Sequence, residues 1–337
     1  MNIPDPYIQP HVVILGAGAS LAAFPNGDKS GKRLPLMNNL VEVVGLEPEL
    51  QAMGISEPVN NFEALFDTLS SEFLGNPHLE IIKEKIYSYF RSLQLPEQIT
   101  LYDQLVLSLR EKDIIATFNW DPFLALAFQR NMHLKRLPNL VFLHGNVFVG
   151  ICLDHHTIGF TNCACTKCGK RFKPVNLLYP VRNKDYTQDA FIALQWDILR
   201  AYLKNAFIIT IFGYSAPQTD AAAREIMSEV WQSNITQTMS EINVVDIKDK
   251  KKVENNWSDF FVKGHYCIYR NVQDTYLLRH PRRSCEAFGS TILNNNPWSE
   301  PQISQTNSLQ DYQDWIQTLM EKEDANNSNH WDFLNPL

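Results

Sequence analysis

Five short runs of mostly apolar residues constrain the fold of this 337-residue chain more than any other feature. Because they are continuous rather than alternating, they are typical of parallel strands buried on both faces. Amphipathic helical patterns lie between them, as at 61–73 and 189–206. This alternation predicts an α/β fold with a doubly wound, mostly parallel, Rossmann-like sheet. The expected strands are His11–Leu15, Asp113–Phe118, Asn139–Leu143, Ala206–Phe212 and Ile242–Ile247.

Composition and charge exclude several classes of protein. The chain is 45% hydrophobic and 20% charged, which is ordinary for a globular protein. Its net charge of −7 provides no overall positive field, which argues against direct nucleic-acid binding. No apolar stretch reaches the ~18 residues that span a bilayer, and the first residues do not form a signal peptide. We therefore expect a cytoplasmic protein without a membrane partner.

The alternation of strands and helices is interrupted twice. Residues 150–188 carry four of the six cysteines and a basic patch, which predicts a small inserted Cys-rich module. From residue 284 the chain is rich in Asn and Ser, and a helix then begins with the capping pattern Ser308 and Asp311. We expect one domain at 1–283 and a C-terminal segment at 284–337, made of a linker, a helix and a tail. The apolar face of that helix is either a docking surface or the last layer of the core.

A glycine-rich sequence, Gly16–Ser20, follows the first expected strand. Such a turn lets backbone N–H groups approach a pyrophosphate, and a following helix adds the positive end of its dipole. Taken alone, the sequence also fits an ordinary tight turn between a strand and a helix. A dinucleotide fingerprint of the dehydrogenase type would need glycine where this chain has Leu21, which disfavours hydride transfer.

Three further strand ends carry polar residues: Thr117–Asp121, His144–Gly145 and Gly213–Ser215. In an open α/β sheet, ligands bind outside the carboxyl ends of the strands, so these residues are expected to meet the glycine turn at one crevice. Each sequence also has a structural interpretation, since an Asn-x-Asp sequence caps helices and a histidine before glycine is often structural. The coincidence of four such strand ends favours a ligand site.

Together these motifs resemble the sirtuins, and in particular the bacterial sirtuin-like proteins of anti-phage defence systems. The resemblance covers about residues 11–250. It implies that His144 is catalytic, that Asn119 and Asp121 address the nicotinamide ribose, and that the glycine turn and the Gly-x-Ser motif bind the phosphates and riboses of NAD. We take Asn119 and His144 as the catalytic residues. The residues assigned to NAD binding are Gly16, Ala17, Gly18, Ala19, Ser20, Thr117, Asp121, Gly213, Tyr214, Ser215 and Asp246. Further matching positions are Asn61-Phe62-Glu63, Tyr179-Pro180, Asn183-Lys184 and Thr219-Asp220.

The cysteines depart from the pattern of the protein-deacylating sirtuins, which have two well separated Cys-x-x-Cys pairs. Here only Cys165 and Cys168 have that spacing, which puts an acyl-peptide cleft in doubt. Four cysteines can form a closed tetrahedral zinc site, and a filled ligand set implies a structural role. We expect one zinc ion held by Cys152, Cys163, Cys165 and Cys168, with His155 or His156 as alternative ligands.

The leading functional hypothesis is an NAD glycohydrolase that acts as the toxic, NAD-depleting effector of a bacterial anti-phage (abortive infection) system. The alternatives are an NAD-dependent protein deacylase and a non-catalytic sensor of NAD or ADP-ribose. In the leading hypothesis, His144 takes a proton from water, Asn119 orients the water or the ribose, and Asp121 stabilises positive charge on the ribose. Such an activity needs restraint, so we expect a homo-oligomer or a regulatory partner, with residues 308–337 as the contact.

Overall fold

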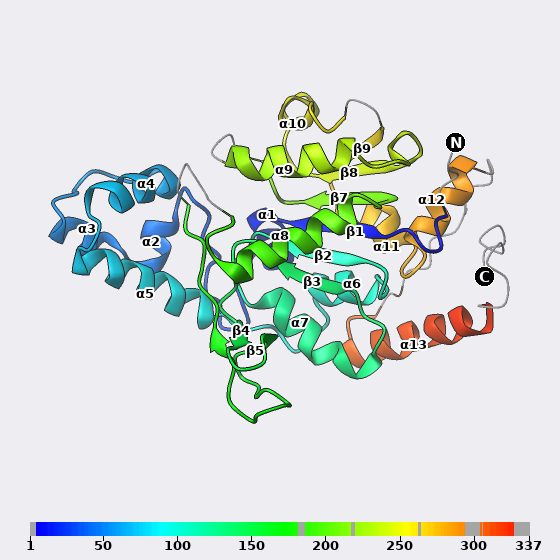
Figure 1. Ribbon diagram of the computed structural model, residues 1–337, viewed down its shortest axis with the longest axis horizontal. Coiled ribbons are helices and arrows are strands. Elements are labelled where there is room, and N and C mark those ends of the chain that lie inside the picture. Colours follow the sequence, from blue (N-terminus) through cyan, green and yellow to red (C-terminus); the bar gives the residue numbers. More distant parts are fainter. Residues whose placement is uncertain are drawn as a thin grey trace.

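The computed structural model describes residues 5–180, 186–216, 220–261, 264–293, 304 and 306–326. A parallel sheet runs through the centre of the molecule (Figure 1). Its strand order is β3-β2-β1-β7-β8-β9, and every neighbouring pair is parallel. The prediction of a doubly wound α/β fold is confirmed. The strands are β1 (His11–Leu15), β2 (Ile114–Thr117), β3 (Asn139–Phe142), β7 (Ile208–Phe212), β8 (Glu241–Val245) and β9 (His265–Tyr269).

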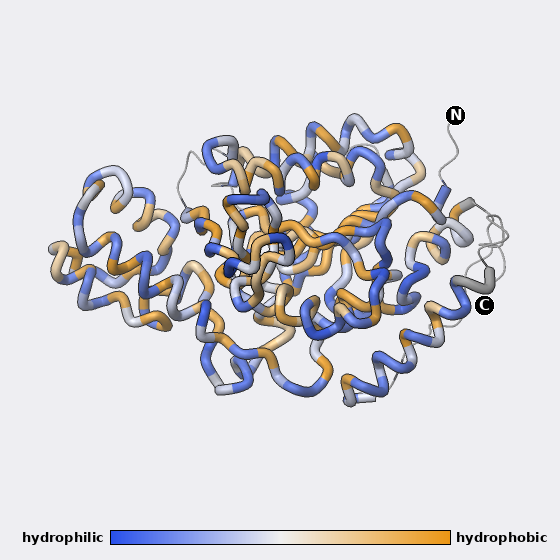
Figure 2. Tube along the Cα trace, turned by 60° about the horizontal axis from the view of Figure 1, so that its bottom comes forward, coloured by the Kyte–Doolittle hydropathy of each residue, from blue (hydrophilic) through white to orange (hydrophobic). Residues whose placement is uncertain are grey.

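The strand order reverses between β1 and β7. The chain adds β2 and β3 on one side of β1, and then returns to place β7, β8 and β9 on the other side. Loops that leave β1 and β7 therefore diverge to opposite faces of the sheet, which opens a crevice at the carboxyl ends of these two strands. Both strands are fully buried, and Figure 2 shows hydrophobic residues concentrated in the sheet.

Helices cover both faces of the sheet. Helix α8 packs on β2, β3 and α9, and it buries Trp196, Leu199 and Leu203 on one stripe. Helix α6 packs against α7, and α11 packs against α6. The helices around the sheet are α1 (Ala17–Ala23), α6 (Leu101–Leu107), α7 (Phe123–Asn131), α8 (Ala190–Leu203), α9 (Ala221–Gln232), α10 (Lys250–Trp257), α11 (Tyr276–Arg279) and α12 (Ser284–Leu293).

Two insertions project from the sheet (Figure 1). Between β1 and β2 the chain forms a helical lobe that was not predicted as a separate unit. The second insertion is the predicted Cys-rich module, an antiparallel sheet with strand order β5-β4-β6. The helical lobe comprises α2 (Leu40–Val44), α3 (Glu47–Ala52), α4 (Phe62–Glu72) and α5 (Pro77–Arg91), and the module comprises β4 (Val149–Cys152), β5 (Thr157–Phe160) and β6 (Lys173–Pro174).

The C-terminal helix α13 (Leu309–Asn326) belongs to the core. Its backbone is capped as predicted, since the Asp311 N–H donates to Ser308 Oγ at 3.2 Å. Its apolar face, which includes Ile316 and Met320, is buried, so that face is the last layer of the core and is not a free docking surface. Trp331, Phe333 and Leu334 lie outside the described residues. Among the residues described, no helix is long and apolar enough to cross a membrane.

Candidate active site

A cavity of about 180 Å³ lies where the strand order reverses, at the carboxyl ends of β1, β2, β3 and β7. Most of the site residues predicted from the sequence line it, although they come from four separate loops. The ones that do so are Gly16, Ala17, Ser20, Asn119, Asp121, His144, Gly213, Tyr214 and Ser215.

Four predicted site residues do not line the cavity. Thr117 and Gly18 shape its loops, because Thr117 Oγ1 accepts the Asn119 N–H at 3.0 Å and the Gly18 N–H donates to Gly213 O at 2.9 Å. Ala19 is buried behind the turn. Asp246 follows β8, where its carboxylate accepts the Lys248 N–H at 2.9 Å. A direct contact of Asp246 with a nucleotide remains a prediction.

The two glycine turns touch each other backbone to backbone. A Cβ at Gly16 would lie 2.6 Å from Gly213 O, and a Cβ at Gly213 would lie 2.1 Å from the Ala19 nitrogen. Gly213 also has a φ of 65°, in the left-handed region that favours glycine. Close packing of the turns after β1 and β7 therefore requires glycine, whatever ligand the cavity takes.

We expect Gly213→Ala to destabilise the protein by ~3 kcal/mol or more, since it combines an unfavourable φ with a backbone clash. Gly75→Ala is the matched control. Gly75 has a φ of 82° but no atom within 4 Å of an added Cβ, so only the conformational cost of ~1 kcal/mol should appear. Chemical denaturation measures both. Equal losses in the two variants would show that the turns can separate without cost.

The Asn119 side chain has a fixed orientation in the cavity wall. Its Nδ2 donates to Gly16 O at 2.9 Å and to Ser20 Oγ at 3.0 Å. A longer contact, at 3.4 Å, reaches Tyr102 OH, and together these acceptors use both amide protons. The amide oxygen Oδ1 is therefore the atom left to accept a hydrogen bond from a ligand hydroxyl or a water molecule.

Asp121 is a buried carboxylate in the same wall. Burial raises its pKa to about 6, and hydrogen bonds from Ser20 Oγ at 2.6 Å and from the Phe123 N–H at 3.2 Å oppose that rise. The carboxyl group is thus mostly ionised at neutral pH, in surroundings that strengthen its attraction for a positive charge.

The raised pKa of Asp121 predicts a pH-dependent stability. The folded protein binds this proton more tightly than the unfolded chain does, so ionisation between about pH 4 and pH 7 costs folding free energy, of the order of 3 kcal/mol. We expect Asp121→Asn to gain stability relative to the parent protein as the pH rises through this range. Urea denaturation at a series of pH values measures the difference. A difference that stays constant would contradict the assignment.

His144 lies at the cavity among aromatic side chains. Its ring meets the Phe118 ring edge-on, with 4.9 Å between centroids, and its Nε2 lies 3.5 Å from Tyr186 OH. Tyr186 and Tyr214 both donate to the Asp220 carboxylate, at 3.5 and 2.9 Å. Tyr186 could not be predicted from the sequence, because no motif around it marks a site.

Asn146 is a second residue that the sequence analysis missed. It is fully buried, and its Nδ2 donates to Asp121 O at 2.6 Å while its Oδ1 accepts the Phe148 N–H at 2.9 Å. These bonds tie the loop that carries Asn119 and Asp121 to the loop that carries His144. The only signal in the sequence is its position two residues after His144.

The remaining walls come from the two insertions. Asn61 caps α4 by accepting the Ala64 N–H at 3.2 Å, which confirms the predicted helix start and places Glu63 on the cavity. The other contributions are Phe118 and Trp120 from the loop after β2, Leu34, Pro35, Met37 and Phe90 from the helical lobe and the segment before it, and Leu178 and Pro180 from the segment after the Cys-rich module. Of the matching positions, Asn183, Lys184 and Thr219 lie outside the described residues.

The charged groups that line the cavity are all acidic. Within the described part of the chain they are Glu63, Asp121 and Asp220, and neither lysine nor arginine is among the lining residues. Such a wall favours a ligand that carries positive charge at this point, or that develops it during a reaction. Among the described lining residues, a phosphate would meet backbone N–H groups and hydroxyls such as that of Ser215 in place of a lysine or an arginine.

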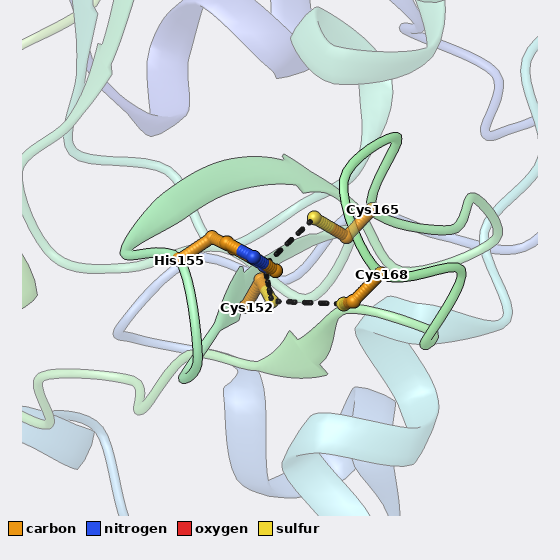
Figure 3. Close-up of side chains that lie close together, drawn as sticks. All are labelled: Cys152, His155, Cys165 and Cys168. Carbon is orange, nitrogen blue, oxygen red and sulfur yellow. Dashed lines mark hydrogen bonds between the residues drawn. The ribbon is translucent and has the colours of Figure 1, made fainter.

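The Cys-rich module holds a cluster with the chemistry of a zinc site (Figure 3). Cys152, His155, Cys165 and Cys168 have ligand atoms within 4.8 Å of one another. Cys152 Sγ lies 3.6 Å from both His155 Nδ1 and Cys168 Sγ. Ligands at about 2.3 Å from a tetrahedral zinc ion lie ~3.7 Å apart, and the separations of 3.6 to 3.7 Å that His155 and Cys152 make with their neighbours fit this geometry.

The fourth cysteine of the expected set, Cys163, is not part of this cluster. It lies exposed in the turn after β5, where its Sγ accepts a hydrogen bond from Gln129 Nε2 of α7 at 3.3 Å. His155, an alternative ligand in the sequence analysis, occupies the fourth position, and Cys152 keeps its place. The structure thus brings together three cysteines and one histidine where four cysteines were expected.

Comparisons with known proteins show a distant likeness of fold. No protein-family model and no curated protein matches the chain. Among solved structures, it is similar to a Sir2 homologue in complex with NAD, at 16% identity and a TM-score of 0.43, over 83% of this chain and 93% of that chain. It is also similar to a mutant Sir2 homologue in complex with ADP-ribose, at 14% identity and a TM-score of 0.41, over 83% and 93%. A third similar structure is a Sir2 complex with an inhibitor, 2′-O-acetyl-ADP-ribose and a deacetylated peptide. Its sequence identity is 14% and its TM-score is 0.38, over 85% of this chain and 94% of that chain.

Proposed function

We propose that this protein is an NAD glycohydrolase, which converts NAD and water to nicotinamide, ADP-ribose and a proton. The observation that carries the proposal is the cavity where the strand order reverses, which combines an oriented amide, a histidine and a wall of carboxylates. The order of motifs along the chain, which resembles that of the sirtuins, supports the same substrate. The likeness to solved Sir2 structures is too distant to add to this argument.

The reaction breaks the bond between nicotinamide and C1 of the ribose. Nicotinamide leaves with the bonding electrons and becomes neutral, so no acid is needed, and the positive charge moves onto the ribose. Glu63, Asp121 and Asp220 surround the cavity and would stabilise that charge.

Water must then add to C1, and its proton must be removed. His144 is the base we assign, because imidazole takes up a proton near neutral pH. Asn119 Oδ1, the free acceptor of that amide, would hold the water or a ribose hydroxyl in place.

Zinc, when bound by Cys152, His155, Cys165 and Cys168, would have a structural role. The four ligands fill a tetrahedral site and leave no position for a reacting water. None of these residues lines the cavity, so the metal would stabilise the module that precedes the cavity-lining segment with Leu178 and Pro180.

We further propose that this activity depletes NAD as the toxic effector of a bacterial anti-phage system, and that self-association or a partner protein restrains it. This rests on the resemblance of the motifs to the defence branch of the sirtuins. Because the apolar face of α13 is buried, any contact made by residues 308–337 must use the exposed side of this helix or the tail. Deletion of 327–337, followed by measurement of NAD turnover and oligomeric state, tests the tail.

The function is tested by incubating the purified full chain with NAD alone and separating the products by chromatography. Equal amounts of nicotinamide and ADP-ribose without any peptide support hydrolysis. Turnover that requires an acyl-lysine peptide would instead establish a deacylase, and binding without products would establish a sensor. Asn119→Ala in parallel excludes a contaminating hydrolase.

A further inference from the structure

The buried hydroxyl of Ser20 has three polar neighbours, and their donor or acceptor character fixes the direction of each hydrogen bond. Ser20 Oγ lies 2.6 Å from Tyr102 OH, 2.6 Å from Asp121 Oδ2 and 3.0 Å from Asn119 Nδ2. An ionised carboxylate only accepts, and an amide nitrogen only donates. Ser20 therefore donates its single proton to Asp121 and accepts from Asn119. The remaining bond must run from the Tyr102 hydroxyl to Ser20.

Tyr102 is suited to be a permanent donor. It lies on α6, is 1% exposed, and does not line the cavity. Its ring stacks on Phe24 at 6.0 Å and packs beside Phe123 at 6.2 Å, so the hydroxyl cannot move away from Ser20. Burial and the nearby charge of Asp121 hold the pKa of Tyr102 well above its usual value of 10, so the phenol keeps its proton at every pH of interest.

We propose that Tyr102 is a positioning residue for the cavity, whose hydroxyl holds Ser20 where it supports both the Asp121 carboxylate and the Asn119 amide. With Ser20 fixed in this way, a flipped Asn119 would place its oxygen against Gly16 O and against an Oγ whose proton is already donated. The acceptor Oδ1 is thereby kept available to a ligand. The catalytic consequence rests on the proposed function, but the effect on Asp121 does not.

Removing the Tyr102 hydroxyl should change the pKa of Asp121. The donation from Ser20 lowers the pKa of Asp121, and a Ser20 hydroxyl without its own donor binds the carboxylate less firmly. The pKa of Asp121 should therefore rise further in Tyr102→Phe. The other titratable groups that line the cavity are His144 and Tyr214 at the strand ends, Asp220 at the start of α9 and Glu63 on α4. The Tyr102 hydroxyl bonds with Ser20 and Asn119, so its removal breaks no hydrogen bond with these four groups.

The test compares Tyr102→Phe, Ser20→Ala and the double variant in the full chain. Tyr102→Phe keeps the packed ring, so the fold should survive. We expect kcat for NAD hydrolysis to fall about tenfold with little change in KM, and the acid limb of the pH profile to move to higher pH. Tyr102 acts chiefly through Ser20, since its other bond, accepted from Asn119 Nδ2, is long at 3.4 Å. Adding Tyr102→Phe to Ser20→Ala should therefore change kcat by less than twofold.

Tyr312→Phe, another buried tyrosine far along the chain on α13, is the matched control and should leave kcat and the pH profile unchanged. Independent effects of the two substitutions on kcat would overturn the proposal. A parent protein without NAD turnover would refute the proposed function, and ¹³C NMR of the aspartate carboxyl groups then decides the inference alone. An Asp121 pKa that is higher in Tyr102→Phe supports it, and an unchanged pKa overturns it.

Discussion

Asn119→Ala is expected to reduce NAD hydrolysis at least ~100-fold while the protein remains folded. The substitution removes the acceptor Oδ1 from the cavity and leaves Ser20 without the amide donor at 3.0 Å. His144→Ala should cause a loss of similar size, because no other described lining residue offers an imidazole to take up the proton from water. Steady-state kinetics with NAD, together with circular dichroism, checks both.

The matched controls are Asn205→Ala and His133→Ala, which replace exposed residues of the same types away from the cavity. Both should retain the parent activity. If folded Asn119→Ala and His144→Ala hydrolyse NAD at the parent rate, the cavity where the strand order reverses is not the active site. A loss confined to one of them would leave the site in place and remove the role assigned to the other.

Loss of the metal is expected to unfold the Cys-rich module before it affects the chemistry. Zinc bound by three thiolates and an imidazole contributes ~10 kcal/mol or more to the folding of such small units. Freshly purified protein should contain one zinc ion per chain, and both His155→Ala and Cys168→Ser should lose it. Elemental analysis measures the metal, and hydrogen exchange of residues 149–174 measures the order of the module.

Cys163→Ser is the discriminating control for the metal site. Cys163 accepts a hydrogen bond from Gln129 and lies outside the cluster. This variant should therefore keep its zinc and the protection of its amides from hydrogen exchange. Metal loss in Cys163→Ser with retention in His155→Ala would restore the four-cysteine ligand set. Absence of zinc from the parent protein would remove the site altogether.

Much of the sheet follows from local sequence, because a strand buried on both faces is apolar at most of its positions. His11–Leu15 illustrates this, since the expected strand and β1 coincide. The edge strand β9 was not predicted, because this signal requires burial on both faces. His265–Tyr269 is only partly buried and mixes polar with apolar residues, so no continuous run marks it. The helical lobe was missed because the stripe on 62–72 predicts a helix but not its packing partner.

The site was predictable to the extent that it is built from strand ends. Asn119 and His144 could be placed together because all carboxyl ends of a parallel sheet lie on one edge. Tyr102 and Asn146 could not, since their roles come from hydrogen bonds that tertiary packing creates. Within α6 (Leu101–Leu107), Tyr102 has the sequence context of an ordinary buried helix residue. The four residues of the metal cluster could not be predicted either. Several cysteines and histidines lie close together in the sequence, and a short loop can fold so that different sets of four come together.

The position of β1 in the strand order also bears on how the chain folds during synthesis. β1 is the earliest of the six strands to leave the ribosome, yet its partners are Ile114 in β2 and Ile208 in β7. Until both have emerged, the mostly apolar segment His11–Leu15 keeps at least one open edge. Pairings this distant in sequence form slowly, and exposed apolar strands aggregate. We therefore expect truncation before Ile208 to give insoluble protein, and production of the full chain to improve with chaperones that hold nascent segments.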